Sequence, residues 1–64
     1  MTQKELLYFE DAIGHEKSII SIINATINNL EDESLINFMK EELTKHKDLE
    51  EKLINLLEVK SNEW

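Results

Sequence analysis

The chain has 64 residues and contains no cysteine, no proline and no arginine, and only one glycine. The lack of cysteine excludes a disulfide framework and a thiolate metal site. The lack of proline, with the single glycine, argues against a β fold rich in tight turns, because such turns depend on these residues. A chain of this length forms one small domain at most, and small domains usually need disulfides, a metal or oligomerisation for stability.

Positive charge is also scarce, since 7 lysines face 14 acidic residues and the formal net charge is -7. An acidic surface without arginine repels phosphate, so we expect neither nucleic acid nor an anionic membrane surface as a partner. No segment approaches the roughly 18 uncharged apolar residues that a membrane-spanning helix needs. The first residues lack the basic and then apolar pattern of a secretory signal. We therefore expect an intracellular, cytoplasmic protein.

The first half of the chain has the pattern of one long helix, predicted at about 3–30. Thr2 followed by Glu5 is typical of a capping box at a helix N-terminus. Residues at heptad spacing form two neighbouring rows: Leu6, Ile13, Ile20 and Ile27, and Phe9, Glu16, Ile23 and Leu30. Because the heptad spacing passes unbroken through the isoleucine-rich part, it favours a helix over a strand there. Glu16 is the one polar member of these rows.

The second half predicts another helix, at about 35–60, after a turn at about 31–34 in which Asp32 is the expected cap. Steps of four and three residues define its inner row: Leu35, Met39, Glu42, His46, Leu49, Leu53 and Leu56. A link this short makes the two helices antiparallel neighbours. The predicted fold is therefore all-α, a single antiparallel two-helix hairpin.

Both helices have apolar faces wider than one partner helix can cover. Beside its rows, the first helix carries Ala12, Ile19 and Thr26, then Tyr8, His15 and Ile22, and the second carries Ile36, Leu43 and Leu57. We expect two hairpins to pair as a homodimeric four-helix bundle. The alternative is a hairpin that docks on a different protein. Trp64 is a candidate to fold back on the end of the bundle.

Three polar residues are predicted to converge inside the hairpin. If the chain turns near residue 32, residues whose numbers add up to about 62 to 65 lie opposite each other, which pairs Glu16 with His46, and Glu42 lies one turn away. Carboxylates and imidazole from facing helices suit iron, manganese or zinc. A Glu–His ion pair with ordered water is the alternative, because polar residues in such rows also set helix register. His15 is interpreted as a surface or interface residue.

Three segments, Tyr8–Lys17, Asp32–Leu35 and Lys45–His46, resemble the short coat-F-type spore coat proteins of endospore-forming bacteria. The resemblance implies a ferritin-like half bundle in which a Glu of one helix and a Glu-x-x-His motif of the next bind metal. Glu16 matches the first position, and Glu42-x-x-x-His46 is one residue longer than the second motif. The resemblance also implies a structural role, a location in the forespore or spore coat, and other coat or bundle proteins as partners.

Three classes of function follow. The first is a structural or interaction protein, and the second is a ferritin-like metal-binding protein with storage or oxidase activity. The third is a regulatory hairpin like the small acidic two-helix phosphatases that act on sporulation regulators, but no serine here is followed four residues later by the aspartate of their motif. An enzyme would need an open coordination position and access for substrate, which the sequence does not indicate. We therefore favour the first class over an enzyme.

Overall fold

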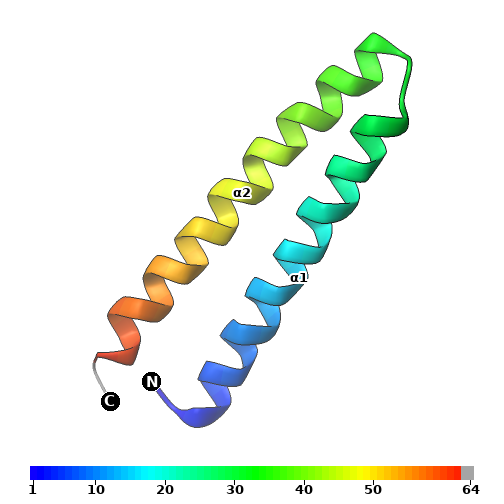
Figure 1. Ribbon diagram of the computed structural model, residues 1–64. Coiled ribbons are helices and arrows are strands. Elements are labelled where there is room, and N and C mark those ends of the chain that lie inside the picture. Colours follow the sequence, from blue (N-terminus) through cyan, green and yellow to red (C-terminus); the bar gives the residue numbers. More distant parts are fainter. Residues whose placement is uncertain (63–64) are drawn as a thin grey trace.

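A computed structural model describes residues 1–62 and contains two helices, α1 (Gln3–Asn29) and α2 (Glu33–Ser61). They run antiparallel, with both ends of the chain at one end of the hairpin and the connection at the other (Figure 1). The described part of the chain contains no strand. These observations confirm the predicted all-α hairpin. The prediction for Trp64 lies outside the described residues.

The N-terminus of α1 begins with the predicted capping box. The Glu5 backbone N–H donates to Thr2 Oγ1 at 3.0 Å, and the Thr2 backbone N–H donates to Glu5 Oε1 at 2.7 Å. Two backbone donors that the first turn leaves unpaired are thereby satisfied. Hydrogen bonds from the Thr2 backbone and side chain lower the pKa of Glu5, because they favour its ionised form.

Asp32 caps α2, so this helix begins two residues earlier than predicted. Its Oδ1 accepts from the backbone N–H groups of Ser34, at 2.9 Å, and Leu35, at 3.1 Å, and from the Ser34 hydroxyl at 2.6 Å. The bond from the Ser34 side chain, followed by the bond from the Leu35 backbone, lowers the pKa of Asp32. The connection therefore consists only of residues 30–32, which forces the two helices to lie side by side.

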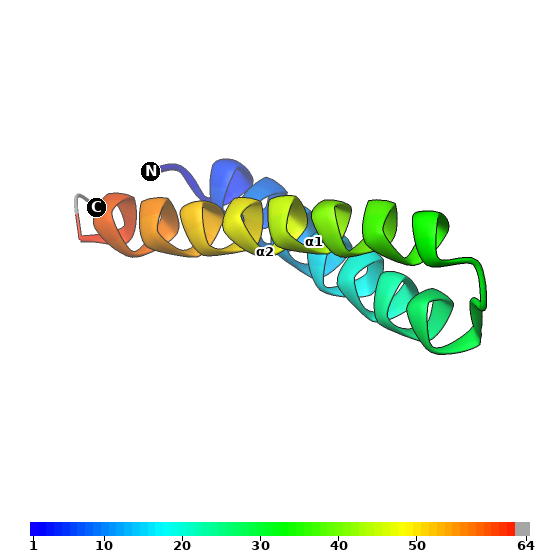
Figure 2. The ribbon, with the colours of Figure 1, turned by 90° about the horizontal axis from the view of Figure 1, so that it is seen from above.

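The two helices cross at a shallow angle, as the perpendicular view shows (Figure 2). Such crossings are typical of helices that pack with heptad-spaced rows. The two buried residues of α1, Ile23 at 5% and Glu16 at 8% exposure, belong to the predicted rows. The remaining six members of these rows are half-buried. The prediction of the α1 contact face is confirmed.

The contact face of α2 differs from the predicted row. The half-buried residues that face α1 at heptad spacing are Ile36, Met39, Leu43, His46, Glu50, Leu53 and Leu57. Leu35, Leu49 and Leu56, which the predicted row places inside, keep between 43% and 50% of their surface exposed. The apolar face of α2 is wider than one neighbour can cover, and α1 packs against the stripe one residue further along. These three leucines therefore do not face α1 within the hairpin, and their position inside a bundle stays a prediction.

The hairpin is long and thin, with Cα extents of 48 × 15 × 10 Å. In residues 1–62, neither helix has a stretch apolar enough to cross a membrane. Only Ile23 and Glu16 are buried among these residues. A two-helix layer this thin has no interior, since every residue lies within one side-chain length of the surface.

Candidate functional site

Glu16 of α1 and His46 of α2 are in direct contact at the middle of the hairpin. His46 Nδ1 lies 2.6 Å from Glu16 Oε2. The Glu16 side chain keeps 10% of its surface exposed and the His46 side chain 28%. Because an ionised carboxylate only accepts hydrogen bonds, we assign the proton of this bond to Nδ1 of His46. The predicted approach of these two residues is confirmed.

Their positions follow from the heptad rows of the two helices. Glu16 lies in the row that packs on α2, between Phe9 two turns before it and Ile23 two turns after it. A carboxylate in such a place loses hydration and needs a compensating partner, which His46 supplies from the opposite helix. No buried side-chain nitrogen or oxygen is left without a hydrogen bond in residues 1–62. The pair is therefore a satisfied polar contact within a mostly apolar interface.

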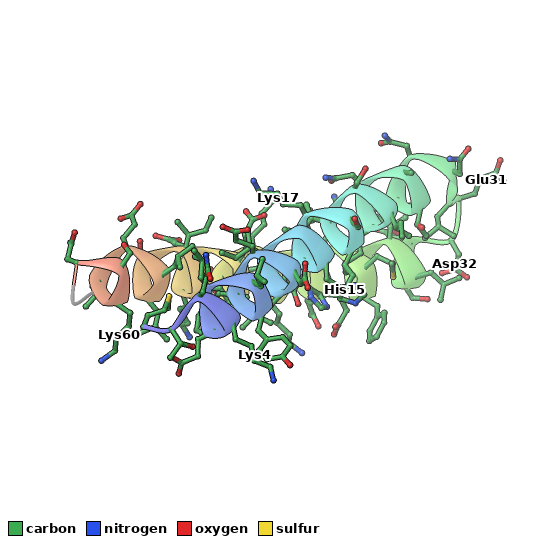
Figure 3. All side chains as sticks on the ribbon, turned by 90° about the horizontal axis from the view of Figure 1, so that it is seen from below. Lys4, His15, Lys17, Glu31, Asp32 and Lys60 are labelled. Atoms are coloured by element: carbon green, nitrogen blue, oxygen red, sulfur yellow. The ribbon has the colours of Figure 1, made fainter. Side chains whose placement is uncertain are left out.

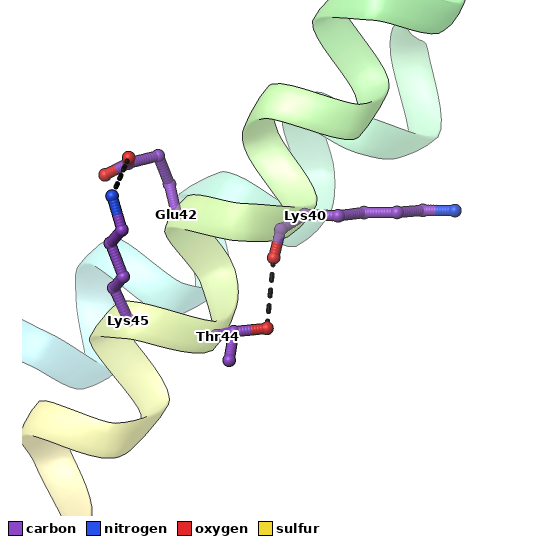
Figure 4. A network of polar contacts seen from close by, with 4 residues as sticks. All are labelled: Lys40, Glu42, Thr44 and Lys45. Atoms are coloured by element: carbon purple, nitrogen blue, oxygen red, sulfur yellow. Dashed lines mark hydrogen bonds and ion pairs between the residues drawn. The ribbon is translucent and has the colours of Figure 1, made fainter.

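Glu42 does not join this pair. Its Oε1 forms an ion pair with Lys45 Nζ at 3.3 Å, on the flank of α2 (Figure 4). The reason is the shift of the α2 contact face, which directs Leu43 towards α1 and leaves Glu42 beside it. In residues 1–62, no group of three or more His, Asp or Glu side chains is placed to hold a metal. Within one hairpin, the predicted set of three thus reduces to the pair Glu16 and His46.

The geometry of the pair leaves Nε2 of His46 available as a ligand or acceptor atom. With Nδ1–H donated to Glu16, the neutral imidazole of His46 has its lone pair on Nε2. A carboxylate that orients an imidazole in this manner is the usual support for a histidine metal ligand. Of the described residues, His46 is the one best placed to act as a metal ligand, and Glu16 would orient it. A complete coordination shell would need further ligands from outside the hairpin.

A second candidate site is the uncovered apolar side of the hairpin. We define the apolar side by seven exposed side chains: Tyr8, Ile22, Leu35, Phe38, Leu49, Leu56 and Val59, each with 43% to 64% of its surface exposed. Half-buried Ala12, Ile19 and Thr26 lie between them and the contact face of α1. Phe38 and Val59 did not stand out in the sequence. The signal that would have found them is their spacing of three residues from Leu35 and Leu56.

Both helices contribute to this same side. On each helix, the residues of the apolar flank come one position before residues of the contact face, as Ala12 comes before Ile13 and Leu35 before Ile36. When two helices pack antiparallel, flanks with the same position relative to the contact face lie on the same side of the pair. The opposite flank of the contact face carries Glu10, Lys17 and Asn24 on α1 and Lys40, Lys47 and the half-buried Ile54 on α2, so it is mostly polar. His15 and Lys17 point to opposite edges of the hairpin and mark its two sides (Figure 3).

The apolar side ends in a groove where the two ends of the chain meet. The groove has a volume of about 400 Å³, and its lining residues are Met1, Glu5, Phe9, Leu56 and Lys60. Phe9 belongs to the α1 contact face, and Leu56 to the apolar side. The groove is therefore an apolar recess with charged edges, suited to an inserted apolar side chain.

Comparison with known proteins identifies no relative: no protein-family model, no curated protein and no solved structure matches this chain. The resemblance to coat-F-type spore coat proteins therefore remains a prediction from short sequence segments.

Proposed function

We propose that this protein is a structural or interaction module that assembles as a homodimeric four-helix bundle through its apolar side. The observation that carries the proposal is the exposure of seven large apolar side chains on one side of both helices. Contiguous exposed apolar surface on a small protein usually marks an interaction site. Five of these side chains lie on α2 and two, Tyr8 and Ile22, lie on α1, so a partner that spans both helices covers them best.

The energies are consistent with self-association. Removing the remaining exposed half of one such side chain from water contributes about 1 kcal/mol, so the two sets of seven contribute about 14 kcal/mol. Association of two proteins costs roughly 4–15 kcal/mol in lost translational and rotational freedom. The apolar side alone therefore approaches what a dimer needs, and half-buried residues such as Ile19 add to it.

A location in the forespore or spore coat, with other coat or bundle proteins as further partners, belongs to the same proposal. Its support is the resemblance of the segments Tyr8–Lys17, Asp32–Leu35 and Lys45–His46 to coat-F-type proteins. A structural role agrees with the geometry, because the polar contact between Glu16 and His46 is already satisfied within the chain.

The alternative is a ferritin-like protein that binds iron, manganese or zinc. The observation that favours it is the orientation of His46 by Glu16. In a dimer the second copy brings its own Glu16–His46 pair. Metal ligands other than His46 of each copy would come from the side chains around these two pairs. Glu42, which pairs with Lys45, contributes only if that ion pair opens.

The experiment is the mass of the protein in solution at micromolar concentration, by sedimentation equilibrium. We expect twice the 7.5 kDa of one chain. Leu49→Lys places a charge in the apolar side and should give helical monomers. Leu7→Lys is the matched control, because Leu7 is also exposed, at 57%, but lies on the other side of α1. A mass of 7.5 kDa for the unmodified chain contradicts the proposal.

A further inference from the structure

We propose that the second copy docks on the apolar side with its connection at the opposite end of the bundle. This inference rests on the proposed dimer and adds its orientation. Two hairpins that cover each other's apolar sides have two arrangements with twofold symmetry. In one, both connections lie at the same end, and in the other they lie at opposite ends. Three features of the chain favour the second.

The first feature is the uneven charge along the hairpin. Glu31, Asp32 and Glu33 form an acidic run at the connection, and all three are exposed. The other end carries Lys4 and Lys60 beside Glu5 and Glu58, so its charges nearly balance; Figure 3 shows the two lysines at the end opposite Glu31 and Asp32. A dimer with both connections at one end gathers six carboxylates there. The opposite arrangement separates the two acidic runs and brings each towards the partner's lysines.

The second feature is the position of Glu42. The contact between Glu16 and His46 lies at the middle of the hairpin, and a twofold axis at this level lets two hairpins overlap over their full length. With connections at opposite ends, α2 packs antiparallel against the partner's α2. A residue of one α2 and a residue of the other then lie at the same height along the bundle when their numbers add up to about 93. Glu42 then lies level with the partner's Lys52, and about 15 Å along the bundle from the partner's Glu42. With connections at one end, the two Glu42 carboxylates lie at the same level along the bundle, where like charges repel.

The third feature is the groove beside Leu56. By the same relation, Phe38 of one copy is level with Leu56 of the other. Phe38 is 57% exposed, and the groove offers the apolar side chains of Phe9 and Leu56 to an aromatic ring that enters it. With connections at one end, the groove would meet the partner's identical groove.

The arrangement also places a specific residue at the axis. On α1, residues whose numbers add up to about 31 are level, so Tyr8 meets the partner's Ile22, and His15 meets the partner's His15. His15 lies on the edge of the hairpin that carries the apolar side (Figure 3). The opposite-end dimer is therefore the arrangement in which position 15 of both copies is adjacent.

The test uses the absence of cysteine from the chain. A spin label on Glu31→Cys reports the distance between the two connections by pulsed electron resonance. We expect about 45 Å, close to the 48 Å length of the hairpin, because each helix of nearly 30 residues spans about 40 Å. A distance below about 25 Å overturns the orientation while leaving the dimer intact. The absence of any intermolecular distance, with a monomeric mass, overturns the dimer itself.

Cross-linking provides a second measurement. In oxidising buffer His15→Cys should form a disulfide-linked dimer, because a twofold axis brings the two Cβ atoms together. Lys17→Cys, two residues away but on the opposite edge, is the matched control and should stay unlinked. Equal cross-linking of the two variants, or none for His15→Cys in a dimeric protein, contradicts the proposed orientation.

Discussion

His46 Nδ1 lies 2.6 Å from Glu16 Oε2, across thirty positions of sequence, at the middle of a mostly apolar helix interface. This single contact defines which residues of α1 and α2 are level. It also explains how the interface accepts a carboxylate of which only 10% of the side-chain surface remains exposed. A polar pair of this kind restricts helix register, because sliding either helix by one turn would separate its two members.

The pair gives a prediction about stability. We expect His46→Leu to lower the free energy of unfolding by roughly 1–3 kcal/mol, because it leaves the buried Glu16 carboxylate without its partner. The double change Glu16→Leu with His46→Leu should be as stable as the natural chain or more so, since buried ion pairs exchange well for apolar residues. Urea unfolding followed by circular dichroism measures both. A double variant less stable than His46→Leu would show that Glu16 makes its contribution elsewhere.

The cap of α2 gives a prediction about pH. The pKa of Asp32 is lowered in the folded chain, so its contribution to stability is fully present above the unfolded pKa, near about 4, and is lost as the pH falls through the lower folded value. Asp32→Asn keeps an oxygen acceptor for Ser34 and Leu35 but does not titrate. We expect the difference in thermal midpoint between the two chains to shrink below about pH 4.

A matched control for the pH experiment is Glu31→Gln, which removes a neighbouring exposed charge without touching the cap. The difference in thermal midpoint between Glu31→Gln and the natural chain measures how much repulsion among the acidic residues of the connection destabilises the fold. If Asp32→Asn and Glu31→Gln shift the acid transition equally, the hydrogen bonds of the cap are not its source.

Gly14 gives a prediction about helix propensity. It is exposed in the middle of α1, on the side away from the apolar side, and a Cβ placed there meets nothing within 4 Å. Gly14→Ala should therefore stabilise the protein by about 0.5–1 kcal/mol, because alanine loses less backbone entropy in a helix. Ala25→Gly, at another exposed position of α1, should destabilise by a similar amount. Chemical denaturation that shows no gain for Gly14→Ala would point to an unseen contact at this position.

The metal alternative gives a prediction that separates His46 from Glu42. If the hairpin binds iron, manganese or zinc through the oriented imidazole, the metal should raise the thermal midpoint of the natural chain, and His46→Ala should abolish that rise. Glu42→Ala should leave it unchanged, because Glu42 pairs with Lys45 instead. Native mass spectrometry after addition of each metal gives the stoichiometry. An identical mass and midpoint with and without all three metals would contradict this alternative.

Much of the hairpin is encoded locally. The capping box of Thr2 and Glu5, the cap at Asp32 and the heptad rows of α1 each depend on neighbouring residues, so their spacing predicts them directly. The short connection then makes the helices antiparallel, and counting outwards from it pairs Glu16 with His46. These features require no knowledge of which surface packs against which.

The face of α2 that packs against α1 is decided by tertiary structure and not by local sequence. Two heptad rows lie side by side on α2, one through Leu35, Glu42, Leu49 and Leu56 and one through Ile36, Leu43, Glu50 and Leu57. Each contains three apolar residues and one glutamate, so composition cannot rank them. Packing against α1 selects the second row, and this choice moves Glu42 out of the polar pair and the first row into the apolar side. Adjacent residues on a helix point about 100° apart, so only the position of the neighbouring helix separates an interface from an exposed surface.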